Sequence, residues 1–250
     1  MTPIPPPPGW GEDILSEFQA SAIQNEYASY VHLRGWQEAF TRCTTALRMI
    51  MDYSMSLAYS ADGTSHLLFI AAHNHFLGAV RLTLSGQALP TYPVGRACME
   101  SALYGYYLAK VPEATARWHC KPTERAALRE WSREFSVSSI SAHLNAGQAK
   151  WAKYLHQTAI DYGAHPNTQA LYSNMSQKEL ADGSIQLEKI ILHEWGLSSA
   201  NSAKFALEVG MFTMALFATV YPEADENYSL SAVNHSLACT LDVLKSEFSE

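Results

Sequence analysis

Residues 92–110 read YPVGRACMESALYGYYLAK, a run of about five helical turns that stops before Pro112. Arg96 and Glu100 lie four residues apart in this otherwise apolar run, so both side chains belong to one face of the helix. Burying a charge costs free energy unless the charge is paired. The stretch therefore predicts a buried Arg96–Glu100 ion pair inside a helical protein.

Helical periodicity continues on both sides of this stretch. Five apolar residues recur at alternating steps of four and three, the spacing of one helix face: Trp36, Phe40, Cys43, Leu47 and Ile50. Residues 64–86 are apolar nearly all round, which is typical of a helix in the middle of a bundle. Further helices are predicted over residues 12–31, 112–135, 137–144, 148–162, 198–221 and 229–248. Ser198 or Ser199 is expected to cap the long apolar helix that begins there.

Two segments depart from the helical pattern. Leu89 to Pro93 is bracketed by prolines and is expected to form a turn before the central helix. Asp182-Gly183 is a hairpin turn signal with near-alternating apolar residues on both sides. The predicted fold is therefore mainly all-α, a multi-helix bundle with a small appended β-hairpin around residues 170–192.

The chain is poor in charged residues. They make up 16% of its 250 residues, against a usual share of about a quarter. A surface so poor in charge is expected to be partly covered, most simply by a second copy of the chain, so we predict a homodimer. We find no internal repeat or linker, and we expect one domain at residues 11–250 behind a proline-rich arm at residues 1–10.

Net charge and charge spacing bear on nucleic-acid binding. The net charge of −7 argues against sequence-independent binding to nucleic-acid backbones. Four basic residues nevertheless recur at steps of four: Lys121, Arg125, Arg129 and Arg133. Neighbouring glutamates nearly balance them, which favours a solvated helix face over a nucleic-acid stripe.

Cysteine usage and targeting signals point to the cytoplasm. The four cysteines lie far apart with no C-x-x-C pair, which is typical of free thiols in a reducing compartment. The first basic residue is Arg34, so we expect no secretory signal. The longest apolar run, Val209 to Tyr221, is too short to cross a bilayer, and we expect no membrane association.

No motif in the sequence indicates a cofactor or a metal ion. The sequence contains no P-loop, no G-x-G-x-x-G and no G-x-S-x-G, so we expect no cofactor. His73 and His75 diverge by about 200° on a helix and cannot share an ion, so we expect no metal either.

The candidate site consists of Arg96, Glu100, Tyr104, His165 and Asn167. Tyr104 shares the helix face of the ion pair, which makes the face either a cradle for a small anion or a structural pair that fixes helix register. Pro166 holds the backbone of His165 outside the helical region. The imidazole then serves as a general base or anion donor, or else it hydrogen-bonds a carbonyl while Asn167 forms an Asx turn.

Several of these residues belong to motifs that resemble those of a known protein family. They are Arg96-x3-Glu100, Tyr104-Gly105-Tyr106-Tyr107-Leu108, Trp118, Phe135 and Asp161-Tyr162-Gly163-Ala164-His165-Pro166-Asn167. Together, across residues 65 to 222, they resemble a family of uncharacterised all-helical bacterial proteins. That resemblance implies a helical bundle and, by itself, no activity.

More remotely, such bundles are similar to HEPN-type proteins. The nuclease members of that group pair as dimers and cut RNA with an arginine and a histidine four to six residues further on. No arginine of this chain has a histidine at that offset. The resemblance therefore implies a variant of this nuclease site, in which Arg96 and His165 are far apart in the sequence but close together in the folded protein.

Two functions from different classes follow. The first is a non-catalytic binding or interaction protein, with the Arg96–Glu100 pair structural or holding a small anion, and with a protein partner or second copy on its apolar surface. The alternative is a HEPN-like, metal-independent ribonuclease in which Arg96 stabilises phosphorane charge and His165 moves the proton. RNA is a partner only in this alternative.

Overall fold

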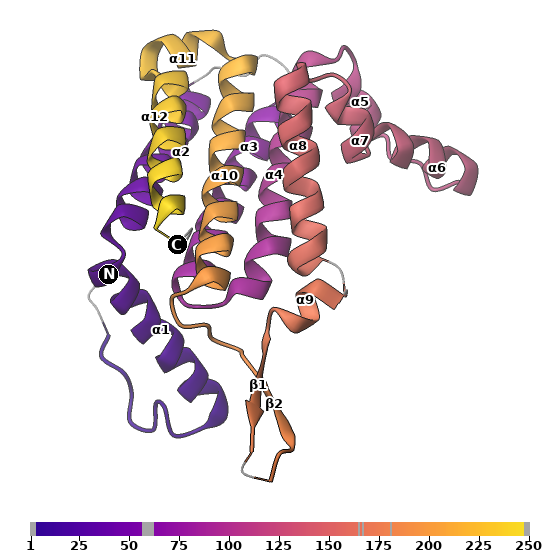
Figure 1. The fold of residues 1–250 in the computed structure, drawn as a ribbon. Helices are drawn as coiled ribbons and strands as arrows, with labels where there is room; N and C mark the ends of the chain where they lie inside the picture. Colours follow the sequence, from indigo (N-terminus) through magenta and orange to yellow (C-terminus); the bar gives the residue numbers. More distant parts are fainter. Residues whose placement is uncertain (1–3, 57–62, 165, 167, 181, 248–250) are drawn as a thin grey trace.

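Helices account for most of the chain, and they pack around three central members (Figure 1). The structure is a computed structural model that describes residues 4–56, 63–164, 166, 168–180 and 182–247. Its elements, in chain order, are α1 (Ile14–His32), α2 (Arg34–Ser56), α3 (Thr64–Leu84), α4 (Ala88–Lys110), α5 (Ala114–His119), α6 (Arg125–Glu134), α7 (Val137–Ser141), α8 (Ala146–Ala159), the π-helical turn η1 (Ile160–Ala164), α9 (Thr168–Tyr172), β1 (Met175–Glu179), β2 (Ile185–Lys189), α10 (Leu197–Val220), α11 (Pro222–Tyr228) and α12 (Leu230–Ser246).

The bundle has α3, α4 and α10 at its centre. Helices α2 and α12 lie beside α10 on one side and α8 on the other, while α11 crosses one end (Figure 1). Half of the largest fully buried side chains among the described residues are phenylalanines: Phe40, Phe69, Phe76, Phe205, Phe212 and Phe217. All five residues of the predicted α2 stripe are buried. The predicted helical bundle with a small hairpin is confirmed.

Two glycines allow the central helices to approach closely. A Cβ on Gly210 of α10 would lie 2.5 Å from the Phe76 ring of α3 and 2.7 Å from Cys43 Sγ of α2. A Cβ on Gly105 of α4 would lie 3.0 Å from the Phe69 ring. Because a side chain at either position would push a neighbouring helix away, both glycines belong to the packing of the core.

The predicted turn at Leu89 to Pro93 is wrong, because this segment forms the start of α4. Pro90 is the third residue of the helix, where a backbone N–H would have no helical partner. Pro93 lies one turn further in and cannot donate to the carbonyl of Leu89. That carbonyl faces Gly163 instead, where a Cβ would come within 2.6 Å of it.

Two further boundaries differ from the prediction. The charged stretch 112–135 forms two short helices, α5 and α6, and Lys121 lies between them rather than on the basic stripe. Pro122 follows it and disfavours a continuous helix. The expected serine cap of α10 is also wrong: Gly196 is the N-cap residue, and Ser199 Oγ donates to the Glu194 carbonyl at 2.9 Å.

The hairpin extends beyond the end of the bundle. Its strands β1 and β2 pair antiparallel around the turn at Gly183, whose φ of +79° favours glycine. The first strand begins at Met175, because residues 168–172, which we expected in part to be strand, form α9. Every residue of β2 is exposed. Among the described residues, the start of β1 is half-buried beside α9, whereas β2 is exposed along its whole length.

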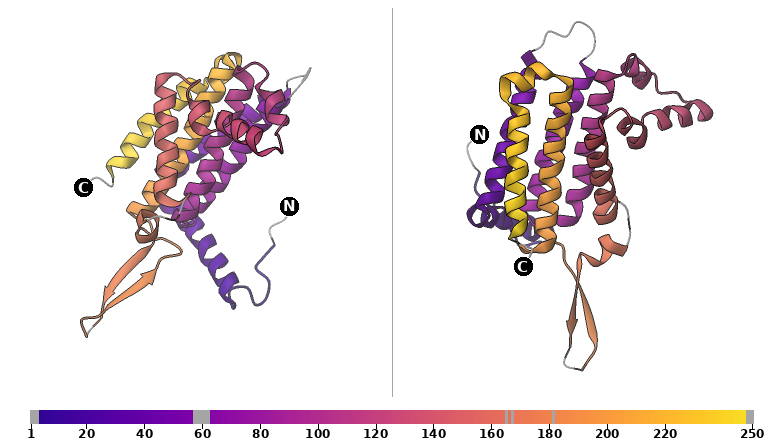
Figure 2. Two further views of the ribbon diagram at one scale, coloured as in Figure 1. Left: turned by 90° about the vertical axis from the view of Figure 1, so that its right-hand side faces the viewer. Right: turned by 45° about the horizontal axis from the view of Figure 1, so that its top comes forward.

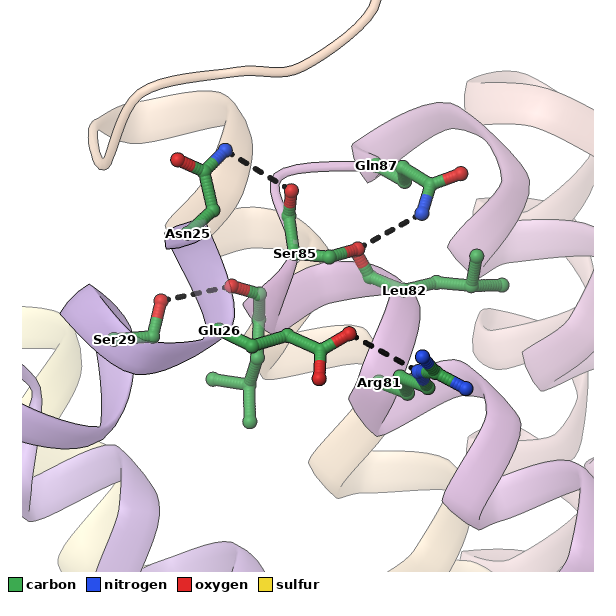
Figure 3. A network of polar contacts seen from close by, with 8 residues as sticks. Asn25, Glu26, Ser29, Arg81, Leu82, Ser85 and Gln87 are labelled. Atoms are coloured by element: carbon green, nitrogen blue, oxygen red, sulfur yellow. Dashed lines mark hydrogen bonds and ion pairs between the residues drawn. The ribbon is translucent and has the colours of Figure 1, made fainter. Parts of the chain in front are cut away.

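Helix α1 leaves the same end of the bundle and is attached by polar contacts (Figures 2 and 3). Ser29 Oγ donates to the Leu84 carbonyl at 2.8 Å, and Asn25 Nδ2 donates to the Ser85 carbonyl at 3.1 Å. These acceptors lie at the C-terminal end of α3, where carbonyls lack helical donors. Arg81 and Glu26 add an ion pair of 3.0 Å. Helix α1 thus caps α3 while leaving much of its own apolar surface uncovered.

Candidate functional site

The predicted Arg96–Glu100 ion pair forms on α4. Arg96 Nε donates to Glu100 Oε1 at 2.7 Å. The two side chains are 25% and 32% exposed, so the pair is only partly buried. The prediction of a pair sealed from water is wrong, because this face of α4 is incompletely covered. The guanidinium of Arg96 is therefore in contact with solvent over part of its surface.

Tyr104 and its neighbours connect α4 to the segment after α6. The Tyr104 hydroxyl donates to the Phe135 carbonyl, and the two rings stack with centroids 6.1 Å apart. Tyr106 donates to the His143 carbonyl at 2.8 Å and Tyr107 to Glu134 Oε1 at 3.1 Å. Burial, and then the Glu100 charge, raises the pKa of Tyr104. The tyrosine motif therefore anchors α6, α7 and the start of α8 to the bundle.

The connection after α8 packs against the start of α4. The rings of Tyr162 and Tyr92 stack with centroids 5.4 Å apart. The Asp161 carboxylate accepts from Gln157 Nε2 at 2.7 Å. His165 and Asn167, the other two residues of the predicted site, lie outside the described residues. The ribonuclease alternative, which needs Arg96 and His165 together, stays a prediction.

A second ion pair, which the sequence analysis missed, lies on α10. Lys204 Nζ donates to Glu208 Oε2 at 2.8 Å, and the side chains are 22% and 12% exposed. The Tyr154 hydroxyl of α8 also accepts from Lys204, and the ammonium lies 4.8 Å from the Tyr154 ring centroid. Burial alone lowers the pKa of Lys204, but Glu208 and Tyr154 outweigh it and raise that pKa. The signal was present in the sequence, since these charges stand four apart in an apolar run.

The described histidines do not gather into a metal site. No group of three metal-ligating side chains occurs in the part of the chain that the structure describes. His73 is buried in the core, whereas His75 is half-buried. His193 Nε2 lies 2.8 Å from Asn174 Oδ1, and His66 stacks on Tyr221. These contacts indicate structural roles for the buried imidazoles.

Stability is expected to fall as the pH drops below about 6.5, where free imidazole is protonated. Burial lowers the pKa of His66, His73 and His193, with Arg48 adding to the effect at His73. The unfolded chain therefore binds protons more tightly than the folded chain. As a result, the free energy of unfolding has its highest value above about pH 6.5 and decreases below it. Urea midpoints at pH 8, 7, 6 and 5 measure the effect.

The control for this pH series is His32→Gln, because His32 is exposed. In this variant the urea midpoint should change with pH as it does in wild type. In a variant that carries both His73→Gln and His193→Gln, the midpoint should change less with pH. Midpoints that stay constant from pH 8 to pH 5 would contradict the burial of neutral histidines.

Two helices have the length and apolar composition to cross a membrane. They are α3 and α10. The apolar run from Val209 belongs to the 24-residue helix α10, whose length agrees with the helix predicted over residues 198–221. In α10, 67% of the most apolar window is buried inside the bundle, against 33% in α3. The apolar surface of α10 is mainly used in core packing.

Comparison with known proteins gives no family assignment. The chain matches no protein-family model, no curated protein and no solved structure. The resemblance to a family of all-helical bacterial proteins therefore stays a prediction.

Proposed function

We propose that the protein is a non-catalytic interaction module that pairs with a second copy of itself through the hairpin end of the bundle. The distribution of exposed apolar side chains supports this proposal. Two thirds of the large apolar side chains exposed among the described residues belong to residues 4–31 or 171–197. These segments include α1, α9 and the hairpin, which leave the bundle at one end (Figure 2). Apolar surface concentrated in this way is typical of an interface.

The exposure of the hairpin is the observation that carries the proposal. A two-stranded hairpin alone is at best marginally stable in water. Ile185 and Leu187 are 64% and 56% exposed and lie on one face of β2. The outer edge of β2 also presents unpaired backbone groups, which are a template for another strand. A partner that adds a strand would satisfy that edge and cover the apolar face.

A second copy fits this edge by symmetry. Antiparallel pairing of β2 with itself, around a two-fold axis at Leu187, places the two Leu187 side chains opposite each other. Gln186 then lies opposite Glu188 of the partner subunit, so no two glutamates face each other. The apolar side chains of both strands lie on one face of the resulting four-stranded sheet.

The Arg96–Glu100 pair has a supporting role in this proposal. It links Arg96 and Glu100 on the partly exposed face of α4. No reaction step is assigned to it.

The test is the oligomeric state, measured by sedimentation velocity at about 1 to 100 µM protein. Wild type is expected to dimerise in this range. Leu187→Glu places two carboxylates opposite each other at the axis, which is expected to weaken dimerisation by about 100-fold or more.

The matched control is Leu67→Glu. It makes the same exchange at a leucine of α3 that is 63% exposed and lies outside the hairpin, so it should dimerise like wild type. A wild-type protein that stays monomeric at every concentration, or a Leu187→Glu variant that dimerises normally, would show the proposal to be wrong.

A further inference from the structure

A proline-rich arm precedes α1 and is open to solvent. Residues 5–8 are four consecutive prolines. Every described residue from 4 to 15 is exposed, with Ile4 at 90% and Trp10 at 39%. Figure 2 shows the arm at the end of α1 that lies away from the bundle. Another protein can therefore reach the arm without any rearrangement of the bundle.

Proline restricts the backbone of the arm. The pyrrolidine ring holds φ of each proline near −65°, and a residue that precedes a proline is restricted to extended backbone. Residues 4–7 each precede a proline, so both restrictions apply to residues 5–7. A segment restricted in this way forms a polyproline II helix, which has no internal hydrogen bonds. Such a segment loses little conformational entropy when it binds.

A hydrogen-bonded turn joins the prolines to Trp10. Trp10 N donates to the Pro7 carbonyl at 3.1 Å, which closes a four-residue turn. Pro8 and Gly9 occupy its central positions, and Gly9 has a φ of +82°. Proline followed by a glycine at positive φ is the signature of a type II turn. The turn therefore sets the direction in which the chain leaves the prolines.

The connection from the turn to α1 is also held by hydrogen bonds. Glu12 N donates to the Gly9 carbonyl at 3.2 Å. Gly11 N donates to Ser16 Oγ at 2.9 Å. Asp13 caps α1, because its Oδ1 accepts from Ser16 N at 3.0 Å. The polyproline segment is thus presented from a hydrogen-bonded junction at the start of α1.

The charges next to the arm are all negative. Glu12, Asp13 and Glu17 follow the prolines, and the first lysine or arginine of the chain is Arg34. Glu12 and Asp13 are both exposed. Acidic groups on a partner would be repelled by these carboxylates, whereas basic groups would be attracted. The charge of the chain therefore favours a partner with basic residues around its binding groove.

We propose that the arm binds a polyproline-recognition domain with basic residues at the rim of its groove. Domains of this kind, such as WW and EVH1 domains, dock polyproline II segments in grooves lined by aromatic side chains. The prolines occupy the aromatic groove, the exposed ring of Trp10 extends the contact, and the basic rim contacts Glu12 and Asp13. The inference does not depend on the proposed dimer, which pairs through β2.

Two probes test the class of partner. They are an EVH1 domain and a WW domain, each chosen with a basic rim, and their binding to the full chain is measured by isothermal titration calorimetry in about 50 mM salt. We expect at least one of them to bind with a Kd below about 500 µM. The control is the same domain with its rim lysines and arginines replaced by glutamine, which should bind about fivefold or more weakly. No binding of either basic domain at about 1 mM would overturn the proposal.

A double variant of the chain tests the prolines. Pro6→Ala with Pro7→Ala restores freedom to the backbone of the arm, so binding should weaken by about tenfold or more. The matched control is Pro112→Ala, at an exposed proline outside the arm, which should bind like wild type. Because the arm is exposed, the urea midpoint of the double variant should equal that of wild type. An affinity that Pro6→Ala with Pro7→Ala leaves unchanged would overturn the proposal.

A second double variant tests the acidic residues. Glu12→Gln with Asp13→Asn removes two charges and keeps the helix cap, since asparagine caps a helix as well as aspartate does. Binding should weaken by about fivefold in about 50 mM salt, and the difference should vanish in about 0.5 M salt. The matched control, Glu223→Gln with Glu226→Gln, removes two charges from exposed positions of α11. Equal affinities of the two double variants would overturn the assignment of a basic rim.

Discussion

Phe135→Ala is expected to lower the free energy of unfolding by about 3 to 5 kcal/mol, the usual loss for removing a buried phenylalanine ring. Phe135 is 2% exposed. Its ring centroid lies 4.9 Å from that of Trp131, 5.8 Å from that of Tyr107 and 6.1 Å from that of Tyr104. Urea unfolding followed by tryptophan fluorescence measures the loss.

The same variant should expose the α6 region to proteases. Helix α6 has no buried residue, so it depends on its ends for attachment. Phe135 follows α6 directly, and its loss should release the helix locally as well as destabilise the whole chain. We expect limited trypsin digestion to cut at Arg125, Arg129 or Arg133 well before the rest of the bundle.

The control for this experiment is Leu128→Ala on α6 itself. Leu128 is only half-buried, so its truncation should cost about 1 kcal/mol. If Phe135→Ala is no more destabilising or protease-sensitive than Leu128→Ala, the ring does not anchor the segment.

Hydrophobic periodicity was sufficient to predict the bundle. The α2 stripe and the apolar run of α10 identify buried faces, because burial requires that spacing whatever the neighbours are. Periodicity failed where the backbone's hydrogen-bond needs decided the boundary. Pro90 lies in the first turn of α4, where a backbone N–H would have no helical acceptor. Pro93 leaves the Leu89 carbonyl without a helical donor, and this carbonyl lies against Gly163, which is distant in the sequence.

The candidate site was harder to predict, because spacing gives a pair but not its burial. Arg96 with Glu100 and Lys204 with Glu208 share one spacing in apolar surroundings. Which pair is more buried depends on the neighbouring helix: Tyr154 of α8 contacts Lys204.

These two ion pairs provide the second prediction. Glu208→Ala is expected to destabilise the chain by about 3 kcal/mol, because it leaves a largely buried ammonium without its carboxylate. Glu100→Ala is expected to cost about 1 kcal/mol, since water screens a pair that is 25% and 32% exposed. Urea unfolding at pH 7 compares the two variants, which differ in burial but not in spacing or in the side chain removed.

A double variant separates the cost of an orphaned charge from the net contribution of the pair. Replacing both partners, as in Lys204→Met with Glu208→Leu, removes the charges and fills similar volume, and such exchanges are often neutral or stabilising. We therefore expect the double variant to unfold within about 1 kcal/mol of wild type, well above Glu208→Ala. Equal losses for Glu208→Ala and Glu100→Ala would mean that the Lys204–Glu208 pair is as hydrated as the pair on α4. A double variant as unstable as Glu208→Ala would instead mean that the pair itself, through its bond to Tyr154, holds α8 against α10.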